Sequence, residues 1–242
     1  MNALLAVLVA FPVVLMYHRV DVSSPRDLIS QRLTISPAQF AAELATIQQK
    51  GLRTVGVGEL AREVAAHRSP RRAVVITFDD GYSDQFRYAF PLLQRFGDRA
   101  IFFVNSGTIG TPGHLSWPQV EAMLRAGMSI GCHGVSHLDL ASLSSSQQGY
   151  QIEDCVRTLN AHLQTTILAY AYPSGDFNAQ TVELEQRAGI LLGFTTDPRF
   201  QTNGTSPYQL TRIRIVSGMS DERFGKILSG PPVFVEVDSP SP

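Results

Sequence analysis

The sequence predicts an α/β protein, a distorted (β/α) barrel with about seven parallel strands. Three observations lead to this fold class. Apolar, strand-like runs alternate with helical patterns about seven times, which favours a parallel sheet. Most of these runs are apolar throughout, as strands covered on both faces require. The chain has 242 residues, a length common for a single α/β barrel. An open doubly wound sheet is the alternative.

The predicted strands are short apolar runs that end at polar or turn residues. They cover residues 13–17, 73–78, 100–104, 128–132, 168–172, 191–195 and 210–216. Parallel barrels carry their active sites at the carboxyl ends of the strands. The residues that follow each run are therefore the first candidates for chemistry.

The helical patterns between the strands carry recognisable start and stop signals. Phe40, Leu44 and Ile47 lie on one face of the first helix, and Ser36 with Gln39 forms a capping box at its start. The predicted helices cover residues 36–50, 57–66, 84–96, 117 to near 127, 145–163, 178–188 and 220–228.

Composition narrows the class of protein. The formal net charge of −1 provides no overall field to attract nucleic acid or an anionic membrane. Cys132 and Cys155 are too few for a disulfide framework, although they allow one bridge. Cys132 precedes His133 in a strand, so its side chain points the other way, and we expect a buried, inert thiol.

Polar side chains gather where several predicted strands end. His18 follows the first run, Asp79 and Asp80 follow the second, and His133 and His137 follow the fourth. Each motif alone is unremarkable, because Asp-Gly is a common turn and a single histidine is often structural. Their joint placement at one end of the predicted barrel favours a metal site.

This set of residue types suits metal-assisted hydrolysis of an acyl bond. One carboxylate and two imidazoles bind a divalent ion, which lowers the pKa of bound water from about 15.7 to about 7. Adjacent strand residues point to different sides, so one of Asp79 and Asp80 can bind metal while the other accepts a proton. His18 can protonate the leaving group. Backbone N–H groups of “YPSGD” at 172–176 can hold an oxyanion.

Three motifs resemble those of the polysaccharide deacetylases with the NodB homology domain: “TFDDG” at 77–81, “HGVSH” at 133–137 and “AYPSGD” at 171–176. The stretches “PVVLMYHRV” at 12–20, “ISPAQFAAELATIQQKGLRTVGVGEL” at 35–60 and “LSWPQVEAMLRAGMSIGCHGVSHLDL” at 115–140 are similar to one branch of that family. The branch includes deacetylases of poly-β-1,6-N-acetylglucosamine. The resemblance covers roughly residues 12–217.

The resemblance implies a role for each residue at the strand ends. Asp79 is expected to be the general base and His18 the catalytic acid. Asp80, His133 and His137 are expected to bind a divalent metal ion, with zinc as the first choice and cobalt or nickel as alternatives. The resemblance also implies a distorted barrel with about seven strands.

Four further residues are expected at the oxyanion site or in the substrate groove. Ser174 and Gly175 would frame the oxyanion. Tyr172 and Trp117 are candidates for contact with a sugar ring, with packing inside the protein as the alternative. Arg212 and Arg214 share one face of the last strand. One of them can therefore reach the site and orient a carboxylate, or both can lie in a solvated or salt-bridged surface pair.

The chain departs from the family pattern at four positions. Gly134 replaces a hydroxyl residue, Leu138 a proline, Ala171 an arginine that orients the base, and Ser174 a tyrosine. None of these changes removes a member of the metal set. We expect these changes to affect the identity of the substrate and the rate of the reaction more than the type of reaction.

The expected activity is removal of N-acetyl groups from an N-acetylglucosamine-containing polysaccharide, such as poly-β-1,6-N-acetylglucosamine, a chitin-like polymer or peptidoglycan. The alternatives are an O-acetyl esterase on xylan-like glycans and a catalytically silent glycan-binding protein. The expected partner is the acetylated polysaccharide and not nucleic acid. Membrane association and oligomeric state are left open. The substrate class implies the cell envelope or exterior.

The resemblance also divides the chain. Residues 12–230 are expected to form the deacetylase domain, and 231–242 a loose tail. Residues 1–11 are apolar, but they lack the basic start of a signal peptide and are short for a membrane span. They are either a remnant of a signal or anchor, or an extension of the first strand, which we favour.

Overall fold

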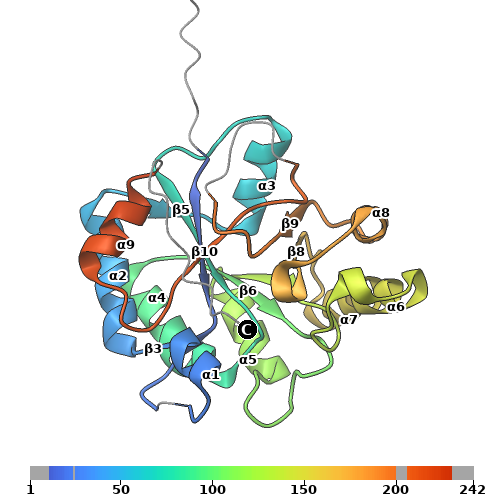
Figure 1. Cartoon of the computed structure of the whole chain (residues 1–242), viewed down its shortest axis with the longest axis horizontal. Coiled ribbons are helices and arrows are strands. Elements are labelled where there is room, and N and C mark those ends of the chain that lie inside the picture. The colour runs from blue at the N-terminus through green and yellow to red at the C-terminus, as the bar shows by residue number, and fades with distance from the viewer. Residues whose placement is uncertain (1–10, 24, 200–205, 231–242) are drawn as a thin grey trace, which may run out of the picture.

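A computed structural model describes residues 11–23, 25–199 and 206–230 of the chain. Its centre is a curled sheet in which neighbouring strands run parallel, in the order β10-β1-β5-β6-β7-β8-β9 (Figure 1). These seven strands are Ile213–Arg214, Val13–Tyr17, Ala73–Phe78, Ile101–Val104, Ser129–Cys132, Ala169–Ala171 and Leu192–Phe194. The short β4 (Arg53–Thr54) pairs with β5, and β2 (Arg19–Val20) pairs with β3 (Thr34–Ile35) in a separate two-stranded sheet.

The last segment of the sheet links its two sides. Leu210 forms a parallel bridge with Phe194 of β9, and three residues later Ile213 pairs with Leu15 of β1. The chain thus passes from one side of the sheet to the other and curls it into a partial barrel. The prediction of a distorted barrel with about seven parallel strands is confirmed.

The helices surround the sheet in two groups. Figure 1 shows α2, α4 and α9 on one side, α6, α7 and α8 on the other, and α3 near the amino ends of the strands. The α-helices are α1 Leu28–Leu33, α2 Pro37–Gln49, α3 Val57–Ala65, α4 Phe90–Phe96, α5 Trp117–Arg125, α6 Ser145–Gly149, α7 Cys155–Leu163, α8 Ala179–Arg187 and α9 Asp221–Leu228. Two π-helical turns, η1 Gln85–Ala89 and η3 Tyr150–Asp154, and two 3₁₀ turns, η2 Leu140–Ser142 and η4 Pro173–Gly175, complete the chain.

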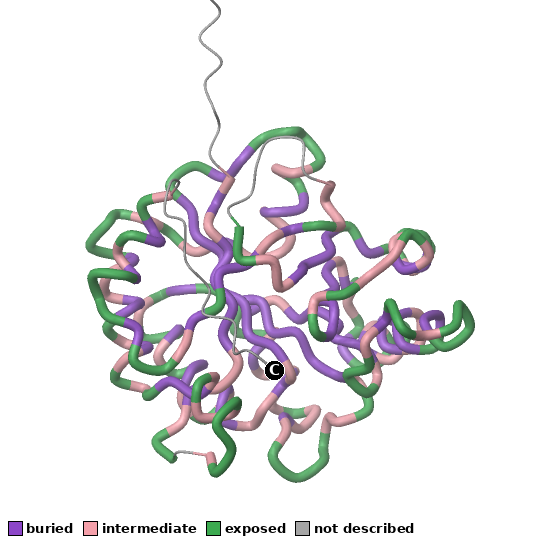
Figure 2. Tube along the Cα trace, in the orientation of Figure 1, coloured by how far each residue is buried: buried purple, intermediate pink, exposed green. Residues whose placement is uncertain are grey.

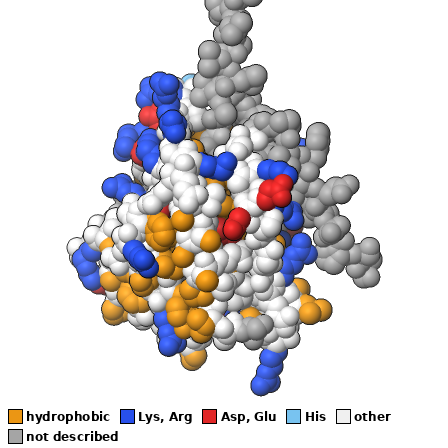
Figure 3. All heavy atoms as spheres, turned by 90° about the vertical axis from the view of Figure 1, so that its left-hand side faces the viewer, with side chains coloured by type: hydrophobic (Ala, Val, Ile, Leu, Met, Phe, Trp, Pro, Cys, Tyr) orange, Lys and Arg blue, Asp and Glu red, His pale blue; other side chains and the backbone are white. Residues whose placement is uncertain are grey.

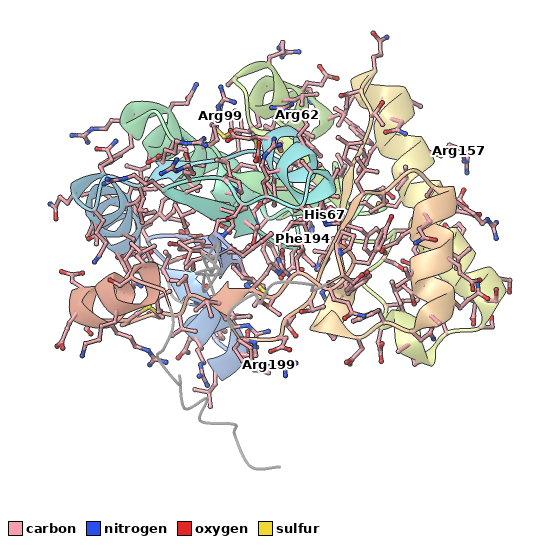
Figure 4. The ribbon with its side chains drawn as sticks, turned by 90° about the horizontal axis from the view of Figure 1, so that it is seen from above. Arg62, His67, Arg99, Arg157, Phe194 and Arg199 are labelled. Carbon is pink, nitrogen blue, oxygen red and sulfur yellow. A yellow bond between two sulfur atoms is a disulfide. The ribbon has the colours of Figure 1, made fainter. Side chains whose placement is uncertain are left out.

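Burial is concentrated in the strands, as Figure 2 shows. One apolar cluster fills the inside of the curl, where the rings of Phe103 and Phe194 lie 5.2 Å apart. Phe194 is labelled near the middle of Figure 4. A second, larger cluster lies between the sheet and its helices and includes Phe40, Phe78 and Phe102. The two clusters make the strands buried on both faces, which is why their sequences are continuously apolar.

The structure differs from the sequence-based expectations in four places. The predicted helix over 84–96 begins with the π-helical turn η1, and the one over 145–163 contains η3. The predicted strand over 210–216 is regular only at Ile213 and Arg214. The elements β2, α1 and β3, which follow His18, carried no clear periodic pattern and were not predicted.

The expectation of a free thiol at Cys132 is wrong. Cys132 at the end of β7 and Cys155 at the start of α7 form a disulfide, and both residues are fully buried. The pairing arises because β7 and the helical segment after it pack together, with Cα atoms 6.2 Å apart.

Two of the predictions concern residues that lie outside the described ones, namely the apolar segment at 1–10 and the tail at 231–242. Within the described parts of the chain, no helix combines the length and apolar character needed to cross a membrane.

Leu28 and Ile29 of α1 are exposed. On the face in Figure 3, apolar side chains gather in one area and most Lys and Arg side chains lie around it.

Candidate active site and metal centre

The carboxyl ends of β5 and β7 bring three potential metal ligands together. Asp80 lies just after β5, His133 directly follows β7, and His137 belongs to the loop beyond. Oδ1 of Asp80 lies 3.4 Å from Nε2 of His133 and 3.3 Å from Nε2 of His137. One ligand atom from each residue lies within 4.8 Å of the other two. The three predicted ligands thus converge on one point.

This donor set fits a divalent metal ion. Oδ1 of Asp80 is buried and has no hydrogen-bond partner among the described residues. Burial opposes ionisation, but the charges of the nearby His133, His18 and His137 imidazoles lower the pKa of Asp80, so it is an anion. A carboxylate with two imidazoles is a common ligand set for zinc and similar ions, and it leaves coordination positions open.

The imidazole of His133 is oriented by a neighbouring strand. Its Nδ1 lies 2.7 Å from the carbonyl oxygen of Ala171 at the end of β8, and the residue is 2% exposed. When Nδ1 donates to that carbonyl, Nε2 is free of a proton and available to a metal ion. Ala171 stands where the motif described above usually has an arginine. It contributes to the site through its backbone carbonyl, which orients the His133 ring.

A tight turn after β5 directs Asp79 and Asp80 to different places. Asp80 has φ of +73° and Gly81 has φ of +71°. A Cβ atom on Gly81 would lie 3.2 Å from the side chain of Val104, so the strained turn also leaves little room there. Gly81 is therefore a structural requirement of the turn, and Asp80 takes a left-handed conformation that aspartate adopts more readily than most residues.

The loop between the two histidines is held by Gln151. Oε1 of Gln151 accepts hydrogen bonds from the N–H groups of Val135 (2.9 Å) and Ser136 (3.0 Å), and its Nε2 donates to Oγ of Ser136 (3.0 Å). The sequence analysis did not single out Gln151. The only feature that could have pointed to it is its polar side chain on the buried face of the predicted helix at 145–163. Gly134 has φ of +88°, and a Cβ there would lie 3.0 Å from Gln151 Oε1, which explains the departure from a hydroxyl residue.

Asp79 pairs with a buried arginine from the other end of the chain. Nη1 of Arg212 lies 2.6 Å from Oδ1 of Asp79, and Arg212 is fully buried. Arg212 also donates to the Thr195 carbonyl (2.8 Å) and to Oγ1 of Thr77 (3.2 Å). Burial opposes ionisation of Asp79, but the Arg212 guanidinium and the nearby histidines hold its pKa below the ordinary range. Of the two arginines considered from sequence, Arg212 is the one that orients the carboxylate.

His18 lies within electrostatic reach of both carboxylates. Its Nδ1 is buried and has no partner among the described residues, and burial lowers the pKa of its imidazole. Nε2 of Gln85 donates to the carbonyl oxygens of His18 (2.8 Å) and Asp79 (2.6 Å). Gln85, which sequence reasoning also missed, thereby ties the end of β1 to the end of β5.

The loop at Pro173–Gly175 offers fewer free backbone donors than expected. Pro173 has no N–H, and the N–H of Gly175 donates to the Tyr172 carbonyl at 2.9 Å. The N–H of Gly175 is thus engaged within its own loop, and the expectation that Ser174 and Gly175 frame an oxyanion stays a prediction. Gly175 has φ of +92°, and a Cβ atom there would collide with Thr196. Ser174 also has a positive φ, of 62°, and is exposed.

The two aromatic residues expected at a sugar site have other neighbours. Tyr172 is fully buried, and its hydroxyl donates to Oε2 of Glu185 at 2.7 Å, so its ring does not line a surface groove. Trp117 stacks on the His162 ring with centroids 3.9 Å apart and packs against the core. The packing alternative holds for Tyr172, whereas Trp117 is partly exposed and its contact with a sugar ring stays a prediction.

Comparison with known proteins places the chain in a family. The family model for polysaccharide deacetylase matches residues 66–193, more than half of the chain. The Bacillus subtilis protein YxkH, described as a polysaccharide deacetylase, is 32% identical over 215 residues, which are 88% of this chain and 74% of that protein. The chain belongs to the polysaccharide deacetylase family. It is therefore a hydrolase of N-acetyl amide bonds in polysaccharides.

Two further relatives bear on the fold and the substrate. The structure of the Streptococcus pyogenes deacetylase PplD in complex with acetate has 30% identity and a TM-score of 0.85, and the alignment covers 91% of this chain and 99% of that one. The poly-β-1,6-N-acetyl-D-glucosamine N-deacetylase of Staphylococcus aureus is 22% identical over 230 residues, which are 89% of this chain and 77% of that enzyme.

Proposed function

We propose that this chain is a metal-dependent deacetylase of an N-acetylglucosamine-containing polysaccharide. The observation that carries the proposal is the convergence of Asp80, His133 and His137 beside the buried pair of Asp79 and Arg212. The names of the relatives support the substrate class, because one is an N-deacetylase of poly-β-1,6-N-acetylglucosamine and another binds acetate, the product of such a reaction.

The proposed mechanism assigns one task to each polar group. The divalent ion, when bound by the three ligands, supplies Lewis-acid activation of water and of the acetyl carbonyl. Asp79, kept ionised by Arg212, takes a proton from the attacking water. His18 gives a proton to the amine nitrogen as it leaves. The N–H of Ser174 is the remaining donor of its loop for the developing oxyanion.

Zinc is the proposed native metal, with cobalt or nickel as alternatives. Two imidazoles and one carboxylate match the borderline character of zinc, and its flexible coordination allows water and substrate to bind together. Metal analysis of protein purified without chelators or added metal is the direct test. A site filled by magnesium or calcium would contradict this assignment, because those ions prefer oxygen ligands.

Metal content and acetate release, measured on the same samples, test the reaction. The wild-type chain is expected to bind one metal ion and to release acetate from N-acetylglucosamine oligomers. Asp80→Asn should lose both properties. Asp98→Asn is the matched control, because Asp98 is also a buried aspartate but bonds Thr54 outside the site. Metal binding without acetate release from amides would redirect the proposal to O-acetyl esters. Glycan binding without metal or activity would favour the binding-protein alternative.

The proposed location is the cell envelope or exterior. The disulfide between Cys132 and Cys155 supports it, because such bonds persist in oxidising compartments. Protein isolated from its native cells under acid quench and then denatured should show no thiol that reacts with a maleimide. Two reactive thiols per chain would count against this location.

A further inference from the structure

Two arginines at the edge of the site have no carboxylate partner among the described residues. Arg214 lies on β10, two residues beyond Arg212 and on the same face of the strand. Its register partner on β1 is Met16, and Ile213 pairs with Leu15, so Arg214 lies nearer the carboxyl end than Arg212 does. Arg212 is fully buried against Asp79, whereas Arg214 is exposed. Arg214 therefore lies toward the carboxyl ends of the strands, the end of the sheet that carries the site.

Arg32, at the end of α1, is tied to the segment that follows Arg214. Arg32 lies in the last turn of α1. The backbone carbonyl of Arg32 accepts a hydrogen bond from the N–H of Ser217 at 2.9 Å. This bond ties α1 to the segment that follows β10. The burial of part of its side chain and the charges of Arg212 and Arg32 lower the pKa of Arg214, and the charge of Asp79 opposes this only in part. The charge of Arg214 also acts on His18, so it reaches the catalytic end of β1.

The neighbouring arginines are already neutralised. Arg19 lies 2.8 Å from Asp84 and 3.9 Å from Asp21, and its guanidinium also lies over the ring of Tyr82. Arg212 uses Asp79. The nearby carboxylates of Asp84, Asp21 and Asp79 thus already pair with Arg19 and Arg212. Arg214 and Arg32 form no ion pair with a carboxylate among the described residues. Ordinary solvated arginines on a surface need no partner, but two held near each other beside a partly buried site repel one another.

We propose that Arg214 and Arg32 form a subsite for an anionic group, a phosphate or a carboxylate, carried by the acetylated glycan near the sugar that loses its acetyl group. Guanidinium groups bind such oxyanions through paired hydrogen bonds. The inference rests on the proposed function and narrows its substrate class from any acetylated glycan to one that bears negative charge.

A comparison of neutral and anionic substrates tests the subsite. Acetate release by metal-loaded enzyme is measured on an N-acetylglucosamine oligomer and on two derivatives of equal length. One derivative carries a phosphate monoester and the other a carboxylate. We expect kcat/KM to be about tenfold higher for at least one anionic substrate at low salt, and we expect this preference to shrink as salt is raised.

The variants Arg214→Gln and Arg32→Gln should each reduce the ratio of anionic to neutral kcat/KM, mainly through KM, and Arg214→Lys should restore part of it. Arg95→Gln is the control, because Arg95 is an exposed arginine in the last turn of α4 and should leave the ratio unchanged. The two derivatives distinguish phosphate from carboxylate as the preferred group.

A second readout separates this inference from the proposed function. Calorimetric titration with the anionic oligomers measures binding directly, even if no substrate releases acetate. Tighter binding of an anionic oligomer, lost in Arg214→Gln, supports the subsite whatever the activity. Equal kcat/KM and equal affinity for neutral and anionic oligomers in the wild type would overturn it. An unchanged ratio in both arginine variants would do the same.

Discussion

At the scale of single residues, the site depends on side chains that have one task each. Asp79 and Asp80 are adjacent in sequence, yet one pairs with Arg212 and the other approaches two imidazoles. Their separation comes from the turn after β5, where Asp80 takes a positive φ. A pair of like charges that would repel each other in solution is thus divided between a guanidinium and a pair of imidazoles.

Arg212→Gln tests the pairing with Asp79. We expect kcat/KM to fall about 100-fold or more, because the base loses its orienting cation. The pKa of Asp79 should rise, since Arg212 lowers it. The acid limb of the pH profile of kcat/KM should therefore move to higher pH.

Arg212 is fully buried, so the variant needs a check that it folds, for example by circular dichroism. If Arg212→Gln does not fold, Arg212→Lys keeps the charge and permits the same pH measurement. A variant that loses activity without any shift of the acid limb would show that Arg212 acts on something other than the ionisation of Asp79.

At the scale of elements, two π-helical turns serve the site in the same way. Gln85 begins η1 and binds the carbonyls that follow β1 and β5. Gln151 lies in η3 and binds the loop between the two metal-binding histidines. A π-turn widens the helix locally, and such turns often occur at functional sites. In both cases a buried glutamine secures backbone that carries catalytic or metal-binding side chains.

Gln151→Ala tests this view of η3. The N–H groups of Val135 and Ser136 would lose their acceptor, so the loop should hold His137 less firmly. We expect metal affinity to fall about 10- to 100-fold, as is usual when a group that orients metal ligands is removed. Competition with a chelator of known affinity measures the change.

Gln148→Ala is the matched control, because Gln148 is a buried glutamine of the preceding helix that bonds Thr181 and the Leu143 carbonyl instead. It should lower stability without a comparable loss of metal affinity. Equal losses of affinity in the two variants would mean that helix stability, and not the loop, governs metal binding.

At the scale of the whole molecule, the site lies where the two sides of the curled sheet meet. β1 and β10 hold His18 and Arg212, and β5 and β7 lead to the metal ligands. Helices α2 and α9 cover the outside of this junction, and α2 buries Glu43 there beside Tyr17 of β1. Packing around this junction therefore couples the stability of the molecule to pH.

Glu43 makes stability fall as pH rises. Burial raises the pKa of Glu43 to about 7, above that of an exposed glutamate. The folded state therefore binds this proton more tightly than the unfolded state. Its contribution is fully present below the pKa of the unfolded chain, and it is lost as pH rises through about 7. The loss can amount to about 3 kcal/mol.

Denaturant unfolding between pH 4 and 8 checks this prediction. The free energy of unfolding of the wild type should decrease across this range relative to that of Glu43→Gln, which cannot ionise. Gln39→Ala, which removes a donor to the Glu43 carboxylate, should enlarge the decrease, because that hydrogen bond favours the ionised form. Parallel pH curves for the wild type and Glu43→Gln would contradict the assignment.

The sequence predicted the barrel class and the main strands and helices. It also predicted the five polar residues at the strand ends, namely His18, Asp79, Asp80, His133 and His137. All of these follow from local patterns, because each of these residues comes at or shortly after the end of an apolar run. The tertiary structure decided the rest. Arg212 meets Asp79 across 133 positions in the chain, and Gln85, Gln151 and the disulfide act through helices packed on the sheet. Such contacts exist only once the sheet has curled, and no spacing of residues along the chain encodes them.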